Sequence, residues 1–180
     1  MQFQDRPGRS LIGQTPYTKT LEQLELFFAK AMLAGYPSGN TSKIVPHRHI
    51  GGWKEYDYSE GKFLLTDEWG EDTGRTWISV YQGTGEIAAP VWVMHYEGHY
   101  EAEVIPFLRS ALATQYSTDV FNGGRGPTRY IDADVDPHLD YHNVVTGSFR
   151  HFTAQEYVYD RSQPTKPLMG SHSCWGGMLI

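Results

Sequence analysis

The chain repeats one ordered set of residues, and this repeat limits the folds open to it more than any other feature. The related pairs are Gly61 with Gly147, Phe63 with Phe149, Tyr81 with Tyr159, and Gly98 with Gly176. The first two pairs are 86 positions apart and the last two are 78 positions apart. A register kept at both ends, with one change of length between, is typical of an internal duplication. The seam between two duplicated units is a natural place for a pocket.

Length and composition predict one domain over residues 1–180, with the repeats at about 18–98 and 103–180. The net charge of −6 and the lack of a Lys/Arg cluster argue against direct nucleic-acid binding. The chain has no apolar run long enough to cross a bilayer and no signal-like leader, so we expect no membrane partner and a cytoplasmic location. The single cysteine, Cys174, excludes an internal disulfide. The sequence leaves the oligomeric state open, a homodimer included.

Two amphipathic helices are predicted, one before each repeat. The first carries apolar residues at helical spacing from Leu21 to Met32 and stops at Gly35. The second begins at Pro106, which suits a first helical turn, and its apolar stripe ends near Gln115.

After each helix the sequence is typical of strands. Two segments, 77–81 and 91–96, are rich in aromatic and β-branched residues and are bounded by glycine and proline. Alternation predicts Ile78 and Val93 on an aliphatic face and Trp92 on an aromatic face. We therefore expect an α+β fold in which duplicated α-βββ units form an antiparallel sheet. The helices would cover the aliphatic face, and an aromatic cavity would lie on the other face.

Several short motifs occur in a fixed order along the chain. They are Val91 to Gly98, the helix Phe107 to Leu112, Gly126-Pro127, Tyr141, Gly147 to Phe149, Glu156, and Trp175 to Gly177. With these motifs, residues 20–180 resemble a bacterial domain family of unknown function. Its members occur alone and C-terminal to helix-turn-helix domains of transcriptional regulators. The resemblance implies a ligand-sensing module and brings no catalytic residues. In this chain the segment before Tyr56 carries one predicted helix and no helix-turn-helix pattern.

The aromatic face is the predicted site for a small-molecule ligand that is largely apolar or aromatic. Aromatic residues make up 14% of the chain, and such side chains supply both core and ligand-facing area. The residues expected to line the site are Tyr58, Trp77, Tyr81, Trp92, Met94, Tyr96, Tyr157 and His172. Two other interpretations stay open: the face is core packed against the other half of the chain, or it is covered by a protein partner.

The alternative function is a cofactor-independent enzyme of isomerase, cyclase or hydrolase type that uses the same pocket. Its acid and base would be His172, His95 or Glu156, since histidine and glutamate commonly transfer protons. Alternation places His172 on the pocket face and the other two on the helix side. A buried Glu156 would need partners, for which Arg150 or a tyrosine hydroxyl are candidates. No cofactor is expected.

No metal site is expected either. His47 and His49 lie two positions apart, which on a strand separates them by about 7 Å, too wide for one ion unless the chain bends. The aspartates between Asp132 and Asp136 imitate the start of a calcium loop, but Pro137 stands where that loop needs glycine.

Overall fold

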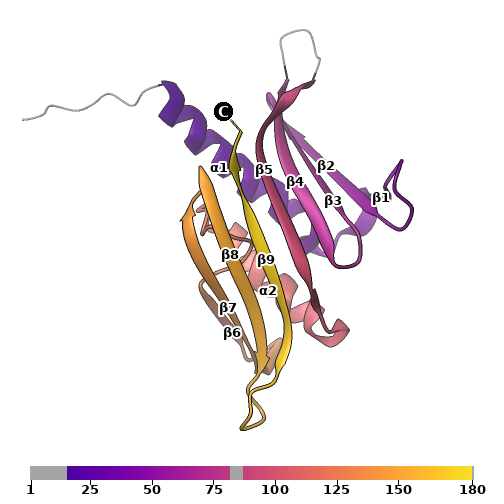
Figure 1. Cartoon of the computed structure of the whole chain (residues 1–180), viewed down its shortest axis with the longest axis vertical. Coiled ribbons are helices and arrows are strands. Elements are labelled where there is room, and N and C mark those ends of the chain that lie inside the picture. The colour runs from indigo at the N-terminus through magenta and orange to yellow at the C-terminus, as the bar shows by residue number, and fades with distance from the viewer. Residues whose placement is uncertain (1–15, 82–86, 180) are drawn as a thin grey trace, which may run out of the picture.

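The computed structural model describes residues 16–81 and 87–179, which form one nine-stranded sheet and two α-helices (Figure 1). The helices are α1 (Pro16–Ala34) and α2 (Ile105–Tyr116), and short 3-10 helices are η1 (Tyr36–Ser38), η2 (Thr41–Lys43) and η3 (Ala102–Val104). The strands are β1 (Ile44–Pro46), β2 (Lys54–Glu60), β3 (Phe63–Trp69), β4 (Thr73–Tyr81), β5 (Ile87–Tyr100), β6 (Arg129–Asp132), β7 (Asp136–Ser148), β8 (His151–Asp160) and β9 (Leu168–Met178). Neither α-helix in these ranges is long and apolar enough to cross a membrane.

The sheet is antiparallel throughout, and its strand order is β1-β2-β3-β4-β5-β9-β8-β7-β6. The strands of the first half therefore follow in order from one edge of the sheet to its centre, and the strands of the second half follow in order from the other edge. The halves meet where β5 pairs with β9 over nine residue pairs, from Trp92 opposite Met178 to Tyr100 opposite Gly170 (Figure 1).

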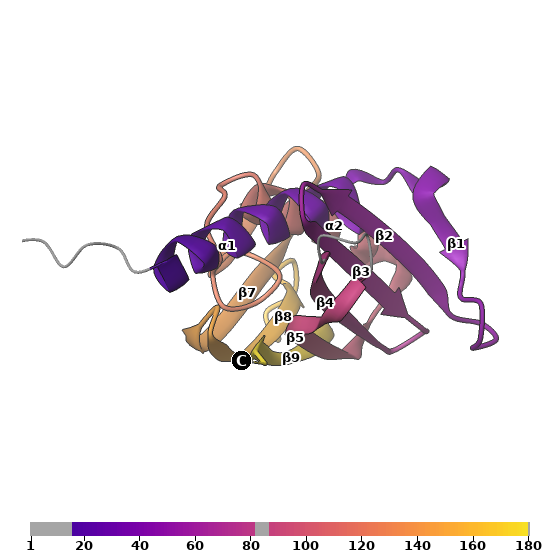
Figure 2. The same cartoon turned by 90° about the horizontal axis from the view of Figure 1, so that it is seen from above.

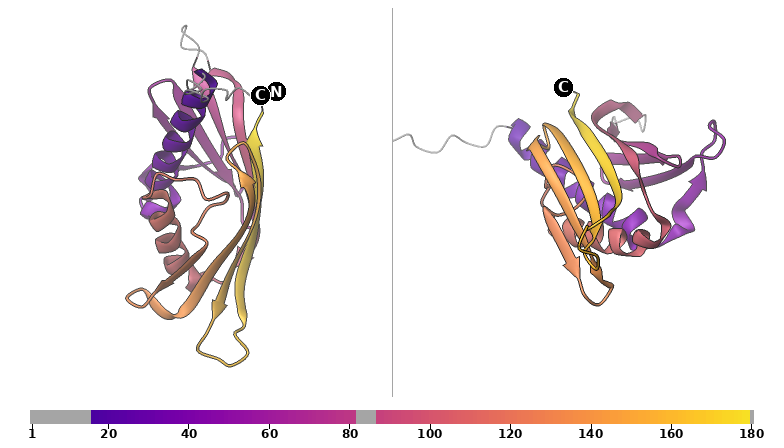
Figure 3. Two further views of the ribbon diagram at one scale, coloured as in Figure 1. Left: turned by 90° about the vertical axis from the view of Figure 1, so that its left-hand side faces the viewer. Right: turned by 60° about the horizontal axis from the view of Figure 1, so that its bottom comes forward.

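Both predicted helices are present. α1 begins at Pro16, five residues before Leu21, where the predicted apolar pattern starts, because proline suits the first turn of a helix. The helices contact each other; α1 also contacts β2 and β3, and α2 contacts β6 and β7. Figure 2 shows α1 running across the strands, and Figure 3 shows the helices as a layer beside the sheet.

The core lies between this helical layer and the sheet. From α1, Phe28 packs against Trp92 of β5 with ring centroids 4.9 Å apart. Trp92 stacks on Phe149 at 4.8 Å, and its Nε1 donates a hydrogen bond of 2.9 Å to the Phe149 carbonyl. The cluster joins both halves of the chain, since Trp92 lies before α2 and Phe149 lies after β7.

The predicted three-stranded first unit is wrong, because its segment holds four strands, β2 to β5. The first unit is longer than the second because it contains one more strand. β3 and β4 fill the interval from Phe63 to Tyr81, whereas only β8 fills the interval from Phe149 to Tyr159. That the two halves are copies of one unit stays a prediction.

The predicted division of the sheet into an aliphatic and an aromatic face is also wrong. The β4–β5 register places Ile78 opposite Trp92, and both side chains are fully buried in the core. Trp77 lies opposite Val93, and both are only partly buried. Hairpin register and a bulge next to Ile78 set this pairing, so composition along each strand could not reveal it. Large aromatic rings bury the most apolar area and occupy the core face.

Candidate functional site

A pocket of about 310 Å³ opens between the helical layer and the core face of the sheet. Both α-helices, η1, strands β2 to β5 and β9, and the connections near them supply its lining. The lining residues are Met32, Tyr36, Pro37, Lys54, Asp67, Trp69, Gly70, Glu71, Thr73, Tyr96, Gly98, His99, Tyr100, Ile105, Leu108, Leu112, Tyr116, Arg125 and His172. The volume is at the lower end of the range for small-molecule sites. Because helix residues form part of its wall, the expectation of a cavity on the face away from the helices is wrong.

The pocket has apolar walls, a polar interior and a charged mouth. Buried Met32, Leu108 and Leu112 form the wall on the helix side. Lys54 and Glu71 are exposed at the mouth and carry opposite charges. An apolar enclosure with a few convergent polar groups is the usual form of a small-molecule site.

Asp67 is the buried carboxylate of the pocket, and it is 5% exposed. It lies in β3, where alternation puts it on the same face as Leu65 and in register with Thr76 of β4. The Thr76 and Tyr96 hydroxyls donate hydrogen bonds of 2.7 and 2.9 Å, both to Oδ1. Burial raises the pKa of Asp67 to about 6, and these two hydrogen bonds and the charge of Arg125 oppose the rise.

Arg125 and Glu156 form a buried ion pair beside the pocket. Arg125 Nη2 lies 2.8 Å from Glu156 Oε2, and the Arg125 backbone N–H donates to Oε1 at 3.1 Å. Tyr100 adds a hydroxyl donor to Oε2 at 3.0 Å. The Arg125 guanidinium also lies 5.2 Å from the ring centroid of Tyr96. The ion pair therefore balances its own charge and leaves Asp67 as a separate negative group.

His172 completes the polar interior. Its ring stacks on Tyr100 at 4.8 Å and lies 6.1 Å from the Tyr96 ring. Burial, and then the positive charge of Arg125, lower the pKa of His172 to about 2. The imidazole is therefore neutral at physiological pH and serves as a hydrogen-bonding group there.

Unpartnered polar atoms gather at this pocket. Within residues 16–81 and 87–179, six buried side-chain nitrogen or oxygen atoms lack a hydrogen-bond partner. Three of them belong to pocket residues: Tyr116 Oη, Arg125 Nε and His172 Nδ1. Buried polar groups in proteins are nearly always paired, because leaving one unpaired costs about 1–3 kcal/mol. Such a concentration indicates a place where a ligand or ordered water supplies the partners.

The absence of a side chain at Gly74 leaves room for the ring of Tyr96. A Cβ atom at Gly74 would lie 2.4 Å from the Tyr96 hydroxyl oxygen, so no other residue fits there unless the ring moves. Gly74 and Tyr96 are register partners in β4 and β5. The small residue thus allows the hydroxyl to reach Asp67.

The structure brings two of the eight predicted ligand-binding residues, Tyr96 and His172, to this pocket. The other six are absent from its lining. Trp92 and Met94 lie on the same face but are fully buried core. Tyr58 packs against Phe27 of α1, with ring centroids 5.8 Å apart.

Trp77, Tyr81 and Tyr157 lie outside the pocket as well. Tyr157 pairs with Ser171, one residue out of phase with His172, so its side chain points to the other face of the sheet.

The three predicted acid–base residues occupy three different environments. His172 lines the pocket. Glu156 is opposite His172 in the β8–β9 register and shares its face, contrary to the expectation, but it is 0% exposed and held by Arg125. His95 pairs with Trp175 on the opposite face and stacks on its ring at 5.9 Å. Glu156 has a tyrosine hydroxyl partner, as predicted, and its arginine partner in the core is Arg125.

Sequence reasoning missed Asp67 and Arg125. Asp67 carried a usable signal, because Phe63, Leu65, Asp67 and Trp69 alternate along one strand face that is otherwise apolar. Arg125 lies in the glycine-rich segment 122–127, and no periodicity marks it.

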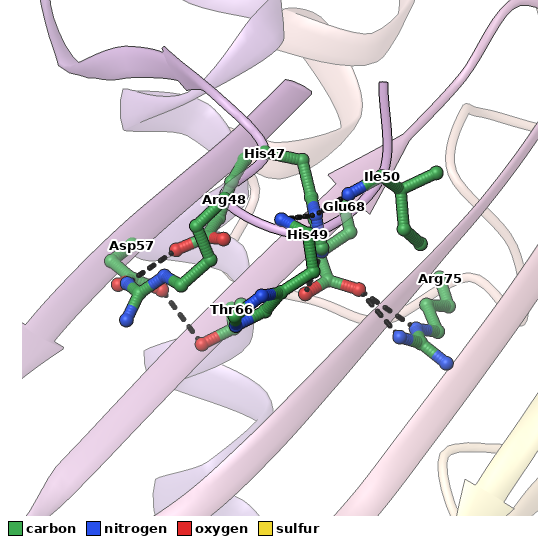
Figure 4. Close-up of polar contacts among 9 residues, drawn as sticks. His47, Arg48, His49, Ile50, Asp57, Thr66, Glu68 and Arg75 are labelled. Carbon is green, nitrogen blue, oxygen red and sulfur yellow. Dashed lines mark hydrogen bonds and ion pairs between the residues drawn. The ribbon is translucent and has the colours of Figure 1, made fainter. Parts of the chain in front are cut away.

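A second polar cluster lies on the other face of β2 and β3, where His47, Glu55 and Glu68 have ligand-type atoms within 4.8 Å of one another (Figure 4). His47 Nδ1 accepts hydrogen bonds from the backbone N–H groups of His49 and Ile50, at 3.0 and 2.9 Å. The ring proton is therefore on Nε2, which donates to Glu68 Oε1 at 2.9 Å.

The remaining contacts of this cluster are salt bridges of its two glutamates with arginines. Arg75 donates twice to Glu68 Oε2, at 2.9 and 2.7 Å, and Arg48 pairs with Glu55 at 3.0 Å. A metal needs a free nitrogen lone pair, and neither ring nitrogen of His47 offers one in this arrangement. These contacts instead attach the segment of residues 47–50 to strands β2 and β3 through hydrogen bonds and salt bridges.

Comparison of the chain with protein-family models, curated proteins and solved structures finds no match. The resemblance to the bacterial domain family of unknown function therefore stays a prediction.

Proposed function

We propose that this protein binds a small, largely apolar or aromatic molecule in the pocket around Asp67, Tyr96 and His172. The observation that carries the proposal is the set of three unpartnered buried atoms, on Tyr116, Arg125 and His172, in the lining of a pocket whose wall on the helix side is apolar. Burial of the ligand's apolar surface would supply the binding energy, and the unpartnered atoms would orient its polar group.

A pocket-filling variant tests this proposal. The neutral fluorescent probe N-phenyl-1-naphthylamine should bind the wild type saturably with one site per chain. Leu112→Trp places a larger side chain in the pocket wall and should weaken binding at least tenfold. The control is Val144→Trp, at a position that is 64% exposed and absent from the pocket lining, and its affinity should be unchanged. Equal binding by both variants, or no saturable binding at all, would contradict the proposal.

We also propose that the two halves of the chain are copies of one unit. In this arrangement both helices lie over the same face of the sheet, and β5 and β9 form the seam between the halves. The inward order of strands from both edges of the sheet supports this.

A second candidate function is a cofactor-independent isomerase, cyclase or hydrolase, and the environment of Asp67 favours it. A pKa raised to about 6 places this carboxyl near the working pH of a general acid or base. Hydrolysis of 4-nitrophenyl acetate and deuterium exchange at the α-carbon of phenylacetone are suitable probe reactions. An enzyme of this kind should accelerate one of them and lose that activity in Asp67→Asn, whereas a receptor should accelerate neither.

A further inference from the structure

Within residues 16–81 and 87–179, Asp67 takes part in no salt bridge. Glu156 and the Arg125 guanidinium neutralise each other at 2.8 Å, and His172 is neutral. At the mouth, Lys54 and Glu71 carry opposite charges. Asp67 remains as one negative charge without a cation of its own, because both of its hydrogen bonds come from neutral hydroxyls and both go to Oδ1. No hydrogen bond reaches Oδ2 from the part of the chain that the structure describes.

The walls favour a positive charge as well. Five aromatic side chains line the pocket, namely Tyr36, Trp69, Tyr96, Tyr100 and Tyr116. Two of these rings already attract cations of the protein itself: Arg109 lies 4.7 Å from the centroid of Tyr36, and Arg125 lies 5.2 Å from that of Tyr96. Aromatic rings bind cations through the negative potential of their faces, and desolvation strengthens the interaction.

We propose that the pocket selects an organic cation, an ammonium group carried on an apolar or aromatic body, with Asp67 as its counter-ion. This inference rests on the proposed function, since it assumes that the pocket binds a ligand. An ammonium group supplies N–H donors for Oδ2 of Asp67 and for the unpartnered Nδ1 of neutral His172. It also brings the charge that a buried lone carboxylate needs.

Three naphthyl probes of similar size and different charge test the choice: 1-naphthylmethylammonium, 1-naphthylmethanol and 1-naphthoate. Titration calorimetry at pH 7.5 should show the ammonium binding at least tenfold more tightly than the alcohol, and the naphthoate most weakly. Asp67→Asn should abolish the preference for the ammonium, so that the ammonium binds no more tightly than the alcohol.

Asp57→Asn is the matched control. Asp57 is an exposed aspartate that accepts a 2.7 Å hydrogen bond from Thr66, much as Asp67 accepts one from Thr76, but it is absent from the pocket lining. The preference for the ammonium should persist in this variant. Circular dichroism and thermal melting verify that each variant is folded.

A pH series on the wild type gives a second test that needs no substitution in the pocket. Protonation of Asp67 should weaken ammonium binding about tenfold per pH unit below about pH 6 and leave alcohol binding constant. The ionisable groups around Asp67 are Glu68 beside it in β3, Tyr56 in β2, Tyr96 in β5, Tyr116 in α2 and Arg125. His99 also lines the pocket, and its hydrogen bond to Asp72 raises its pKa, so the series is repeated in His99→Gln.

The outcomes separate the two proposals. If the alcohol binds and the ammonium gains nothing over it, or if naphthoate binds most tightly, the cation assignment is wrong and the proposed ligand-binding function stands. If no probe binds the wild type, the proposed function itself fails, and this inference fails with it.

Discussion

Arg125 Nη2 lies 2.8 Å from Glu156 Oε2 in the middle of the protein, and the two side chains are only 9% and 0% exposed. The contact joins the loop after α2 to strand β8, and the Tyr100 hydroxyl of β5 donates to the same oxygen. Both charges lose their hydration in the core, and the attraction between the guanidinium and the carboxylate compensates for that loss. Either one left alone would be a buried, uncompensated ion.

This relationship predicts a strongly non-additive pair of substitutions. Arg125→Met or Glu156→Gln alone should lower the free energy of unfolding by about 3–5 kcal/mol, whereas the double variant should lose much less than the sum. Urea denaturation of the four proteins measures the coupling. The pair Arg129 and Asp140, at 2.7 Å, is the control because its arginine is 57% exposed, and breaking it should cost about 1 kcal/mol or less. Additive losses at Arg125 and Glu156 would contradict the prediction.

Trp92 should behave as a core residue. It is fully buried, stacks on Phe149 and donates to the Phe149 carbonyl, so Trp92→Ala removes packing and leaves a cavity. The expected loss is about 3–5 kcal/mol of unfolding free energy, measured by urea denaturation. Trp175→Ala, at a residue that is 40% exposed, should cost far less. A loss at Trp92 as small as that at Trp175 would show that Trp92 is not part of the core.

Local signals were enough to predict both helices and the strands that contain residues 77–81 and 91–96, and they failed where the pairing of strands decides which face a residue occupies. Apolar residues at helical spacing marked both helices, with Gly35 after the end of α1 and Pro106 in the first turn of α2. The face of each strand residue depends on the register between strands, and the pairing of Ile78 with Trp92 cannot be read from either strand alone.

The same contrast holds for the site. His172 and Tyr96 were predicted because aromatic strand residues suggested a pocket, and Asp67 could have been predicted from its position in an apolar alternation. Arg125 could not have been predicted, because the tertiary path of an irregular loop sets its position against Glu156.

Zinc should not stabilise the protein at the His47 cluster. Nδ1 accepts two backbone hydrogen bonds and Nε2 carries the proton donated to Glu68, so no ring lone pair is free for an ion. Thermal melting with and without excess Zn²⁺ should give the same midpoint. A higher midpoint in zinc that disappears in His47→Gln would contradict this hydrogen-bond assignment.

Asp67 should reduce stability at neutral pH. Because its pKa is raised from 3.8 to about 6, the folded protein holds a proton between these values that the unfolded chain has released. The contribution of Asp67 to stability therefore falls as pH rises through this window, by up to about 3 kcal/mol. Asp67→Asn removes the effect and keeps an oxygen acceptor for the Thr76 and Tyr96 hydroxyls, so it should be more stable than the wild type at pH 7.5 and similar at pH 4.

Urea denaturation across this pH range measures that gain, with Asp57→Asn as the control. A wild type that is more stable than Asp67→Asn at pH 7.5 would contradict the prediction. A gain would also fit a binding site, where a group that costs stability is retained for its interaction with a ligand.

His172 should act in the opposite sense over the same range. Its pKa is lowered from 6.5 to about 2, so the unfolded chain gains a proton below pH 6.5 that the folded protein does not. Its contribution to stability is complete above pH 6.5 and is lost as pH falls, by about 1.4 kcal/mol per pH unit. Between about pH 4 and 6 this loss offsets the gain from Asp67.

His172→Gln should therefore become more stable on acidification from pH 6 to 4, because only the effect of Asp67 remains. Asp67→Asn should become less stable, and the wild type and the double variant should change little. Urea denaturation of the four proteins at each pH measures these slopes, and a common slope in both single variants would show that the two groups do not titrate in opposition.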